Sequence, residues 1–565
     1  MSLLFPWRKD LAPDHSFSGD ILAGAILTIM LIPQSLAYAV LAGMPPHTGL
    51  YASILPLLAY ILLGRSPILA VGPVAIASVM TFDALRTLAT PMSAEWMAAA
   101  AFMAICSGLL LLAMGFLRLG FLAQLLSHPV MSGFLSGAAL LIVLGQLKGL
   151  TGIPMSGGAA PSMIVGLFTG LQQIQMGTLQ VGLATLALLI LLRVKGRPLL
   201  SALGLRGNAL DLSSRALPLL VIVAVGLALA LLGMGEITPL VGPIPEGLPP
   251  ISIPETPQLD LQGLFWSAAL ISLVGFIESV AMAQALGRKV GMGSVDANAE
   301  LRGLGAANLA AGFGQAFPVT GGLTRTVVNV EAGARSPIAG IVCAGLMVVA
   351  MMGAGGLIAI LPLASLSALI IVSASTLFDT KTLIASWRFD RADGLSWLIT
   401  FMGVLLLGIE TGIVLGIALS VLIILWRLSR PHVAVLGRIS GTEHFRNIHR
   451  HAVETLPDTS FVRIDANLFF GNWTRVREAI DQALETTESA PRHLVLCLTS
   501  VSDIDATALE GLIELQRDLK ASGVTLHLSE IKGPLSDKLA GALSEFPVHL
   551  SNHSAFEQLA KSRLG

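Results

Sequence analysis

The sequence predicts a polytopic α-helical membrane protein of about 14 transmembrane helices, followed by a small α/β domain. Three observations support this fold class. Hydrophobic residues make up 54% of the 565 residues and charged residues only 12%, whereas soluble domains are about one quarter charged. Apolar stretches long enough to cross a bilayer recur between residues 21 and 428. After Arg430 the chain becomes polar, and strand-like and helix-like segments alternate.

The apolar stretches form two sets of seven, because a run of roughly 17–25 apolar residues suffices for one helical span. The first set covers residues 21–41, 47–63, 68–88, 96–117, 122–147, 179–192 and 217–234. The second set covers residues 264–286, 295–313, 320–330, 337–358, 361–378, 395–408 and 412–428. These limits predict an N-terminal segment over residues 1–20, a transmembrane region over 21–430 and a C-terminal domain over 431–565.

Loop charges predict how the spans are oriented. Arg8 and Lys9 precede the first span, and five basic residues lie between residues 193 and 215. The loop over residues 235–260 contains four acidic residues and neither lysine nor arginine. By the positive-inside rule, we expect both termini in the cytoplasm and the spans in the cell (inner) membrane, surrounded by lipid. The net charge of -1 offers no basic surface, so we expect no nucleic-acid partner.

Two spans in matching positions of the two sets are interrupted by glycine and proline. The third opens with AVGP at residues 70–73, and the tenth with FPVTGG at residues 317–322. Paired interruptions of this kind are the best sequence indication of a transporter's substrate site. A half-helix that begins there directs unpaired N–H groups toward the membrane midplane, which favours an anion. The alternative is that glycine and proline are simply more frequent in membrane helices.

Three polar residues lie inside predicted spans, where polar groups are costly and usually functional. Gln34 follows Pro33 in the first span, Glu278 lies near the middle of the eighth, and Arg325 lies one turn into the tenth. Gln34 can donate hydrogen bonds to an anion or, alternatively, to a neighbouring helix. Glu278 suits proton transfer during transport or, alternatively, an ion pair with Arg325. Both interpretations place the Arg325 guanidinium in the bundle interior, where it suits an anion.

The C-terminal domain has the pattern of a small α/β fold. Residues 461–470, 493–500 and 524–530 are predicted strands, and residues 505–523 form a predicted helix with Asp505 near its N-cap. With about 130 residues, the domain is long enough for its own core.

Several segments resemble the SulP anion permease family. The resemblance lies in residues 32–56 (IPQSLAYAVLAGMPPHTGLYASILP), residues 64–79 (GRSPILAVGPVAIASV) and residues 277–334. The C-terminal domain resembles the STAS domain that these permeases carry. The resemblance covers essentially the whole chain and implies a 7+7 inverted repeat, in which a core domain moves against a gate domain, usually within a homodimer.

The resemblance also implies a binding site between the third and tenth half-helices. The residues expected to contact the anion are Gln34, Tyr38, Val74, Gly322, Leu323, Thr324 and Arg325. Glu278 matches an acidic position associated with ion coupling. Many members have a serine-rich run where this chain has GGLTR at residues 321–325, so the resemblance does not fix the substrate.

A further expectation concerns Thr507 in the C-terminal domain. STAS domains that are phosphorylated carry the acceptor hydroxyl in a turn after a strand, and Thr507 matches that position with Asp505 as the nearby acid. The alternative is that Asp505 caps a helix and Thr507 is an ordinary residue of its first turn.

The remaining motifs argue against enzymatic function. The chain has no phosphate-binding GxxxxGK[ST] loop and no HExxH motif, and its three cysteines are too widely spaced for a metal site. We therefore expect neither an enzyme nor a bound cofactor or metal.

The expected function is secondary active uptake of a small anion by alternating access, in symport with a proton carried by Glu278. Sodium coupling, a passive exchanger or channel, and a non-transporting sensor are the alternatives. Sulfate, bicarbonate and a dicarboxylate all suit a site built from helix termini and an arginine.

Overall fold

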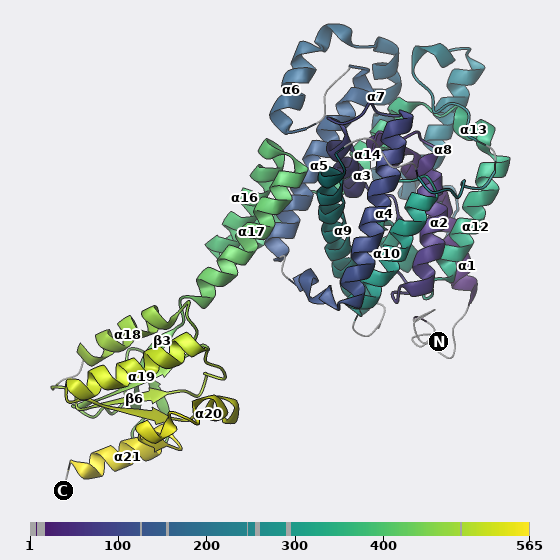
Figure 1. The fold of residues 1–565 in the computed structure, drawn as a ribbon. Coiled ribbons are helices and arrows are strands. Elements are labelled where there is room, and N and C mark those ends of the chain that lie inside the picture. Colours follow the sequence, from purple (N-terminus) through teal and green to yellow (C-terminus); the bar gives the residue numbers. More distant parts are fainter. Residues whose placement is uncertain are drawn as a thin grey trace. The chain divides into compact units, whose positions relative to one another are not determined.

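The computed structural model describes residues 7, 17–124, 127–153, 158–245, 247–254, 260–289, 295–485 and 489–563. Contacts divide the chain into two compact units, Met1–Ser420 and Val421–Gly565, called here the helical unit and the C-terminal unit. The helical unit is built almost entirely of helices, and the C-terminal unit contains a six-stranded sheet flanked by helices (Figure 1).

The transmembrane region has two halves of similar element order. The first half contains α1 (Phe17–Leu41), α2 (Thr48–Leu63), β1 (Val71–Gly72), α3 (Ala75–Leu85), α4 (Ala94–Phe116), α5 (His128–Thr151), α6 (Ala160–Thr169), α7 (Met176–Ala202) and α8 (Gly207–Leu231). The second half contains α9 (Leu261–Lys289), α10 (Ala297–Phe313), β2 (Thr320–Gly321), α11 (Leu323–Glu331), α12 (Ile338–Gly353), α13 (Gly355–Ala359), α14 (Leu363–Ala374), α15 (Thr380–Phe389), α16 (Arg391–Leu407) and α17 (Ile409–Leu428).

Every predicted span overlaps one of these helices. Within the described residues, eight helices are long and apolar enough to cross a membrane unaided, and four further apolar helices are shorter. The sequence did not predict α6 and α15, because a helix of ten residues is too short to register as a span. The third and tenth spans are short because each begins as a strand, β1 or β2, before α3 or α11 starts.

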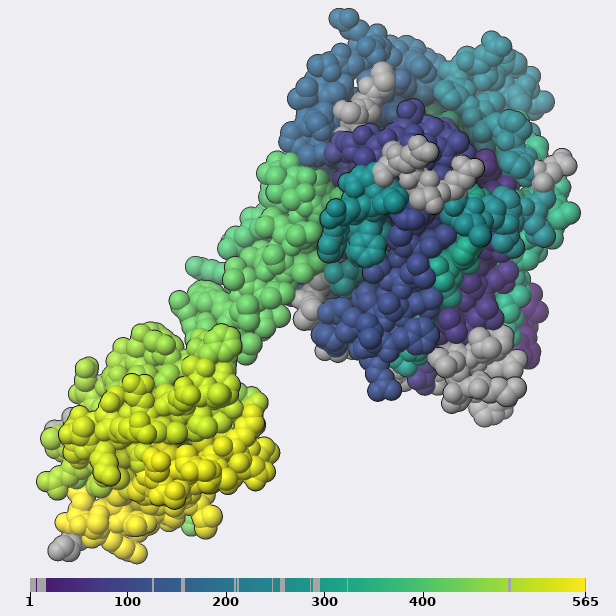
Figure 2. All heavy atoms as spheres, viewed as in Figure 1, coloured from purple at the N-terminus to yellow at the C-terminus, as the bar shows by residue number. Residues whose placement is uncertain are grey.

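The two halves pack as if a two-fold rotation exchanged them. α3 packs on α9 while α11 packs on α1, so each half-helix contacts the first helix of the other half. Likewise α4 packs on α10 and α12 packs on α2. Figure 2 shows α4, in dark blue, beside teal segments of the second half. These equivalent contacts between elements in matching positions of the two halves agree with the predicted inverted repeat.

β1 and β2 meet inside the helical unit as a two-stranded antiparallel ladder. Val71 pairs with Gly321 and Gly72 with Thr320. Asn308 of α10 holds the approach to β2, accepting from Val319 N–H at 2.9 Å and donating to its carbonyl at 2.8 Å. Non-helical backbone at membrane depth requires such internal partners, because lipid supplies none.

The C-terminal unit folds around one sheet of order β4-β3-β5-β6-β7-β8, in which β5 to β8 are parallel. Its strands are β3 (Val433–Arg438), β4 (Phe445–Asn447), β5 (Thr459–Ile464), β6 (His493–Cys497), β7 (Thr525–Ser529) and β8 (Val548–His549). Its helices are α18 (Trp473–Glu485), α19 (Ala506–Ala521), α20 (Gly533–Leu539) and α21 (Asn552–Ser562).

Two hydrophobic clusters cover the opposite faces of this sheet. Along β6, Leu494 and Leu496 pack with α18, α19 and α20, while Val495 and Cys497 pack with α21. This alternation follows from the two-residue period of a strand. The unit therefore has its own core on both faces of the sheet.

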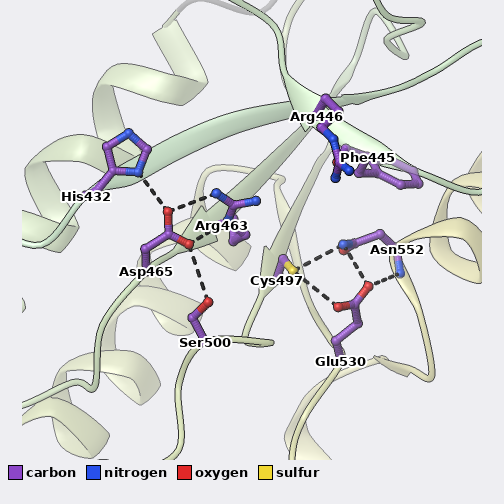
Figure 3. Close-up of polar contacts among 9 residues, drawn as sticks. All are labelled: His432, Phe445, Arg446, Arg463, Asp465, Cys497, Ser500, Glu530 and Asn552. Atoms are coloured by element: carbon purple, nitrogen blue, oxygen red, sulfur yellow. Dashed lines mark hydrogen bonds and ion pairs between the residues drawn. The ribbon is translucent and has the colours of Figure 1, made fainter. Parts of the chain in front are cut away.

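The first strand predicted in the C-terminal domain, over residues 461–470, corresponds to β5, which ends earlier than predicted, at Ile464. Asp465 follows the strand and accepts hydrogen bonds from Arg463 at 2.6 and 2.9 Å, while His432 lies 2.8 Å from the same carboxylate (Figure 3). Asn467 then accepts from the backbone N–H groups of Ser502 and Asp503. These side-chain contacts replace the ladder and turn the chain out of the sheet.

A second polar cluster lies at the end of β6 (Figure 3). Asn552, the first residue of α21, donates to the Cys497 sulfur at 3.1 Å and to Glu530 at 3.0 Å. Burial of Cys497 raises the pKa of its thiol, so the thiol acts here as a hydrogen-bonding core group. The cluster fastens the start of α21 to the ends of β6 and β7.

Candidate functional site

The two half-helices begin at residues with extended backbone. Val74 precedes α3 with φ -130° and ψ 154°, and Gly322 precedes α11 with φ -96° and ψ 127°. Neither start carries a side-chain hydrogen bond of the kind that usually caps a helix. The first-turn N–H groups and the positive ends of both helix dipoles therefore remain available to a bound anion.

Two longer helices contribute side chains to the same place. Gln34 and Tyr38 are four residues apart on α1, which places them on one face of that helix. Glu278 lies on α9. Because α1 packs on α3 and α11, and α9 packs on the same two half-helices, all four elements converge on one point.

A cavity of about 30 Å³ lies at this convergence. Its lining residues are Gln34, Tyr38, Val74, Ala75, Ile76, Glu278, Gly322, Thr324, Arg325, Ser373, Ala374 and Leu377. A volume of this size holds about two water molecules or a small ion, but no organic molecule of drug size.

The cavity collects polar atoms that the surrounding chain leaves without partners. Within the described residues, Gln34 Oε1, Glu278 Oε2 and all three guanidinium nitrogens of Arg325 are buried and form no hydrogen bond. Arg325 and Glu278 form no ion pair there, so the interpretation of these two residues as a structural pair is wrong for this conformation. An uncompensated buried charge is costly, which points to a partner that comes from outside the chain.

The Arg325 guanidinium lies close to the crossing of the two strands. Its carbon lies 6.0 Å from the centre of the Tyr38 ring. A Cβ atom on Gly72 of β1 would overlap Arg325 Nη1, so a larger residue at this position would displace the guanidinium from where it lies. β1 and Tyr38 therefore hold the guanidinium at the cavity. Arg325 is only 1% exposed, so its charge is almost fully removed from solvent.

The structure brings together seven of the eight membrane-site residues expected from the sequence, since these line one cavity. The side chain of the eighth, Leu323, lies outside the described part of the chain. Ser373, Ala374 and Leu377, from the end of α14 and the turn η5 (Ser375–Leu377), line the cavity and were missed. Their predicted span is mostly apolar, and its scattered hydroxyl residues (Ser365, Ser367, Ser373, Ser375 and Thr376) do not show which side of the helix lines this cavity.

Thr507 lies elsewhere, exposed in the first turn of α19. Asp505 is the N-cap of that helix and accepts from the N–H group of Ala508 at 2.8 Å. This geometry is what the capping alternative describes. Phosphorylation of Thr507 stays a prediction.

Comparison with known families bears on the whole chain. The sulfate permease family model matches residues 17–400, and the STAS domain model matches residues 450–555. The chain belongs to the sulfate permease family. The predicted membrane fold with a C-terminal STAS domain is thereby confirmed.

Relatives of this sulfate permease family member are named as transporters. It is 34% identical to the probable sulfate transporter MT1781 of Mycobacterium tuberculosis CDC 1551, over 93% of this chain and 91% of the relative. It is 30% identical to the sodium-independent sulfate anion transporter of Bos taurus, over 94% of this chain and 87% of the relative. Both relatives are thus named as transporters of sulfate.

Two solved structures share the fold. The murine anion transporter Slc26a9 in the inward-facing state matches with a TM-score of 0.87 at 22% identity, over 99% of this chain and 94% of that one. The transmembrane domain of the cyanobacterial bicarbonate transporter BicA matches with a TM-score of 0.59 at 19% identity, over 72% of this chain and 98% of that one.

Proposed function

We propose that the protein is a secondary active transporter that carries a small anion across the cell membrane together with a proton, by alternating access. The anion binds between the N-termini of α3 and α11, and Glu278 carries the proton. The names of the relatives support sulfate as the first substrate to test, and BicA supports bicarbonate as the second. A homodimer with both termini in the cytoplasm belongs to the same proposal.

The observation that carries this proposal is the unpartnered guanidinium of Arg325 in a cavity shared with two uncapped helix starts. All three features favour negative charge, and together they offer a small anion several hydrogen-bond donors at once. Gln34 lines the same cavity from α1, and the NH2 group of its amide is able to donate to an anion there.

Glu278 supplies a physical reason for coupling. A deprotonated carboxylate in the same small cavity repels the anion, and a proton on Glu278 removes that repulsion. Proton binding and anion binding therefore favour each other, and by linkage the effect is reciprocal. A proton gradient can then drive accumulation of the anion.

The test is uptake of labelled sulfate, bicarbonate and a dicarboxylate into proteoliposomes under an imposed proton or sodium gradient. We expect a proton gradient to drive accumulation of at least one of these anions. Replacing Glu278 by glutamine keeps the shape of the side chain but cannot carry the proton, so Glu278→Gln should lower pH-driven accumulation by about tenfold or more.

The matched control is Glu331→Gln, at the far end of α11, where the side chain is 60% exposed and pairs with Arg215. This variant should transport normally. Accumulation that needs sodium and ignores the proton gradient would replace proton coupling with sodium coupling. Potential-driven current without accumulation would indicate a channel.

A further inference from the structure

A second and much larger cavity lies in the helical unit. It has a volume of about 410 Å³ and is formed where α1, α3 and α5 end and where α7 and α14 begin, with α6 beside them. Its lining is mainly apolar and includes Val79, Phe82, Leu141, Ile142 and Met163. A volume of this size accommodates a drug-sized organic molecule, which the small anion cavity cannot hold.

The large cavity and the anion cavity lie between the same three elements. On α1, Tyr38 lines the anion cavity and Val40 lines the large one. On α3, Ile76 lines the anion cavity and Val79 the large one. α14 likewise contributes Ser367 to the large cavity and residues from Ser373 onward to the other. The large cavity therefore lies directly beyond the anion cavity, toward the ends of α1 and α3.

The charges of the lining define the chemistry of a ligand. Two ionisable residues line the cavity, Asp83 and Lys148. The Asp83 carboxylate is already compensated, because Arg86 Nε lies 2.5 Å from it. Within the described residues, no ion pair involves Lys148, and its exposed side chain places a positive charge at the edge of the apolar lining. Gln146 and Gln175 add hydrogen-bonding groups near it.

We propose that this cavity binds one amphipathic organic anion, with its apolar body against the lining and its acidic group at Lys148. The occupant separates α14 from α1 and α3 and closes the route to the anion cavity from this side. The obstruction of transport rests on the proposed function, whereas the binding itself does not. The occupant is thus an inhibitor and not a substrate.

The probe is naphthalene-2-sulfonate, with uncharged naphthalene-2-sulfonamide as its matched partner, titrated calorimetrically onto the full chain in phosphatidylcholine nanodiscs. Empty nanodiscs give the lipid background. We expect one sulfonate per chain and binding of the sulfonamide about tenfold weaker, the value of one charge-assisted hydrogen bond. Lys148→Gln should weaken sulfonate binding by a similar factor and leave sulfonamide binding unchanged.

A second variant fills the cavity. A Cβ atom on Gly145 meets only Met163 Cε, at 4.0 Å, so Gly145→Leu should place its side chain in the cavity and abolish binding. Its control is Gly345→Leu on α12, where a Cβ atom meets nothing within 4 Å. If Gly145→Leu fails to fold, Lys148→Gln still decides the matter, because that lysine is exposed.

The second readout is anion flux in proteoliposomes, which the sulfonate should slow in the wild type and not in Lys148→Gln at the same concentration. Sulfonate binding no greater than to empty nanodiscs, or equal in Gly145→Leu, overturns the site. Binding without any slowing of flux overturns the obstruction. If the wild type shows no flux of any anion but binds the sulfonate, the proposed function fails and the site stands.

Discussion

Arg325 is the residue on which the membrane site depends. A guanidinium with five N–H donors is buried to 1% exposure, and its nitrogens find no partner among the described residues. Natural cores avoid this arrangement unless a ligand repays the cost. Gly72 and Tyr38 hold the group in place without neutralising it, so the empty site is electrostatically strained and favours occupancy by an anion.

Arg325→Met should therefore raise the free energy of unfolding of the anion-free protein and, at the same time, abolish anion binding. Methionine fills a similar volume without charge, so we expect a gain of about 1–3 kcal/mol in the absence of anion. Substrate anion at about 100 times its Kd should stabilise the wild type by about 2.7 kcal/mol and leave the variant unchanged. Thermal unfolding with and without anion measures both effects. An anion-dependent shift that persists in the variant would contradict the role of Arg325.

At the scale of elements, the two strand–helix segments, β1 with α3 and β2 with α11, bring backbone N–H groups to the anion cavity. β1 and β2 satisfy each other by pairing, and α3 and α11 then start without side-chain caps. The sequence could predict these segments because glycine and proline interrupt a helix through local backbone effects, whatever the helix packs against. The contribution of α14 could not be predicted, because its three serines are spread along an otherwise apolar helix and do not show which residues face a cavity and which face lipid.

Three histidines form a ladder across neighbouring strands of the C-terminal unit. His493 of β6 lies 3.1 Å from His527 of β7, and His527 lies 3.0 Å from His549 of β8, nitrogen to nitrogen. Burial, and then its two neighbours, lower the pKa of His527 to about 4. Burial also lowers the pKa values of His493 and His549, the first opposed by Asp458. The sheet is therefore built for neutral imidazoles at these positions.

The ladder should make the C-terminal unit sensitive to acid. The unfolded chain takes up a proton at His527 near pH 6.5, and the folded chain only near pH 4. The neutral His527 therefore contributes fully to the stability of the folded unit above pH 6.5. This contribution is lost as pH falls from about 6.5 to about 4. We expect the free energy of unfolding to fall by about 2 kcal/mol over that range, after allowance for partial solvation.

Denaturant unfolding of a fragment spanning residues 431–565 between pH 8 and pH 4 measures this loss. His527→Gln should flatten the dependence, whereas His444→Gln, at an exposed position, should retain it. A stability that does not change between pH 6.5 and pH 4 in the wild-type fragment would contradict the prediction.

The whole molecule combines two units whose cores share no residues. The core of the helical unit and the two clusters of the C-terminal unit are built from separate parts of the chain. All residues that line the anion cavity belong to the helical unit. Anion binding should therefore need only the first unit, whatever the C-terminal unit does to the rate of transport.

A chain truncated after residue 430 tests this separation. We expect it to insert, to remain intact on gel filtration, and to show an anion-dependent shift in thermal unfolding with a Kd within about twofold of the full chain, which is about 0.4 kcal/mol. Arg325→Met in the truncated chain should abolish the shift, which shows that the response comes from the same cavity. A truncated chain that is intact but no longer responds to the anion would place part of the site in residues 431–565, because only those residues have been removed.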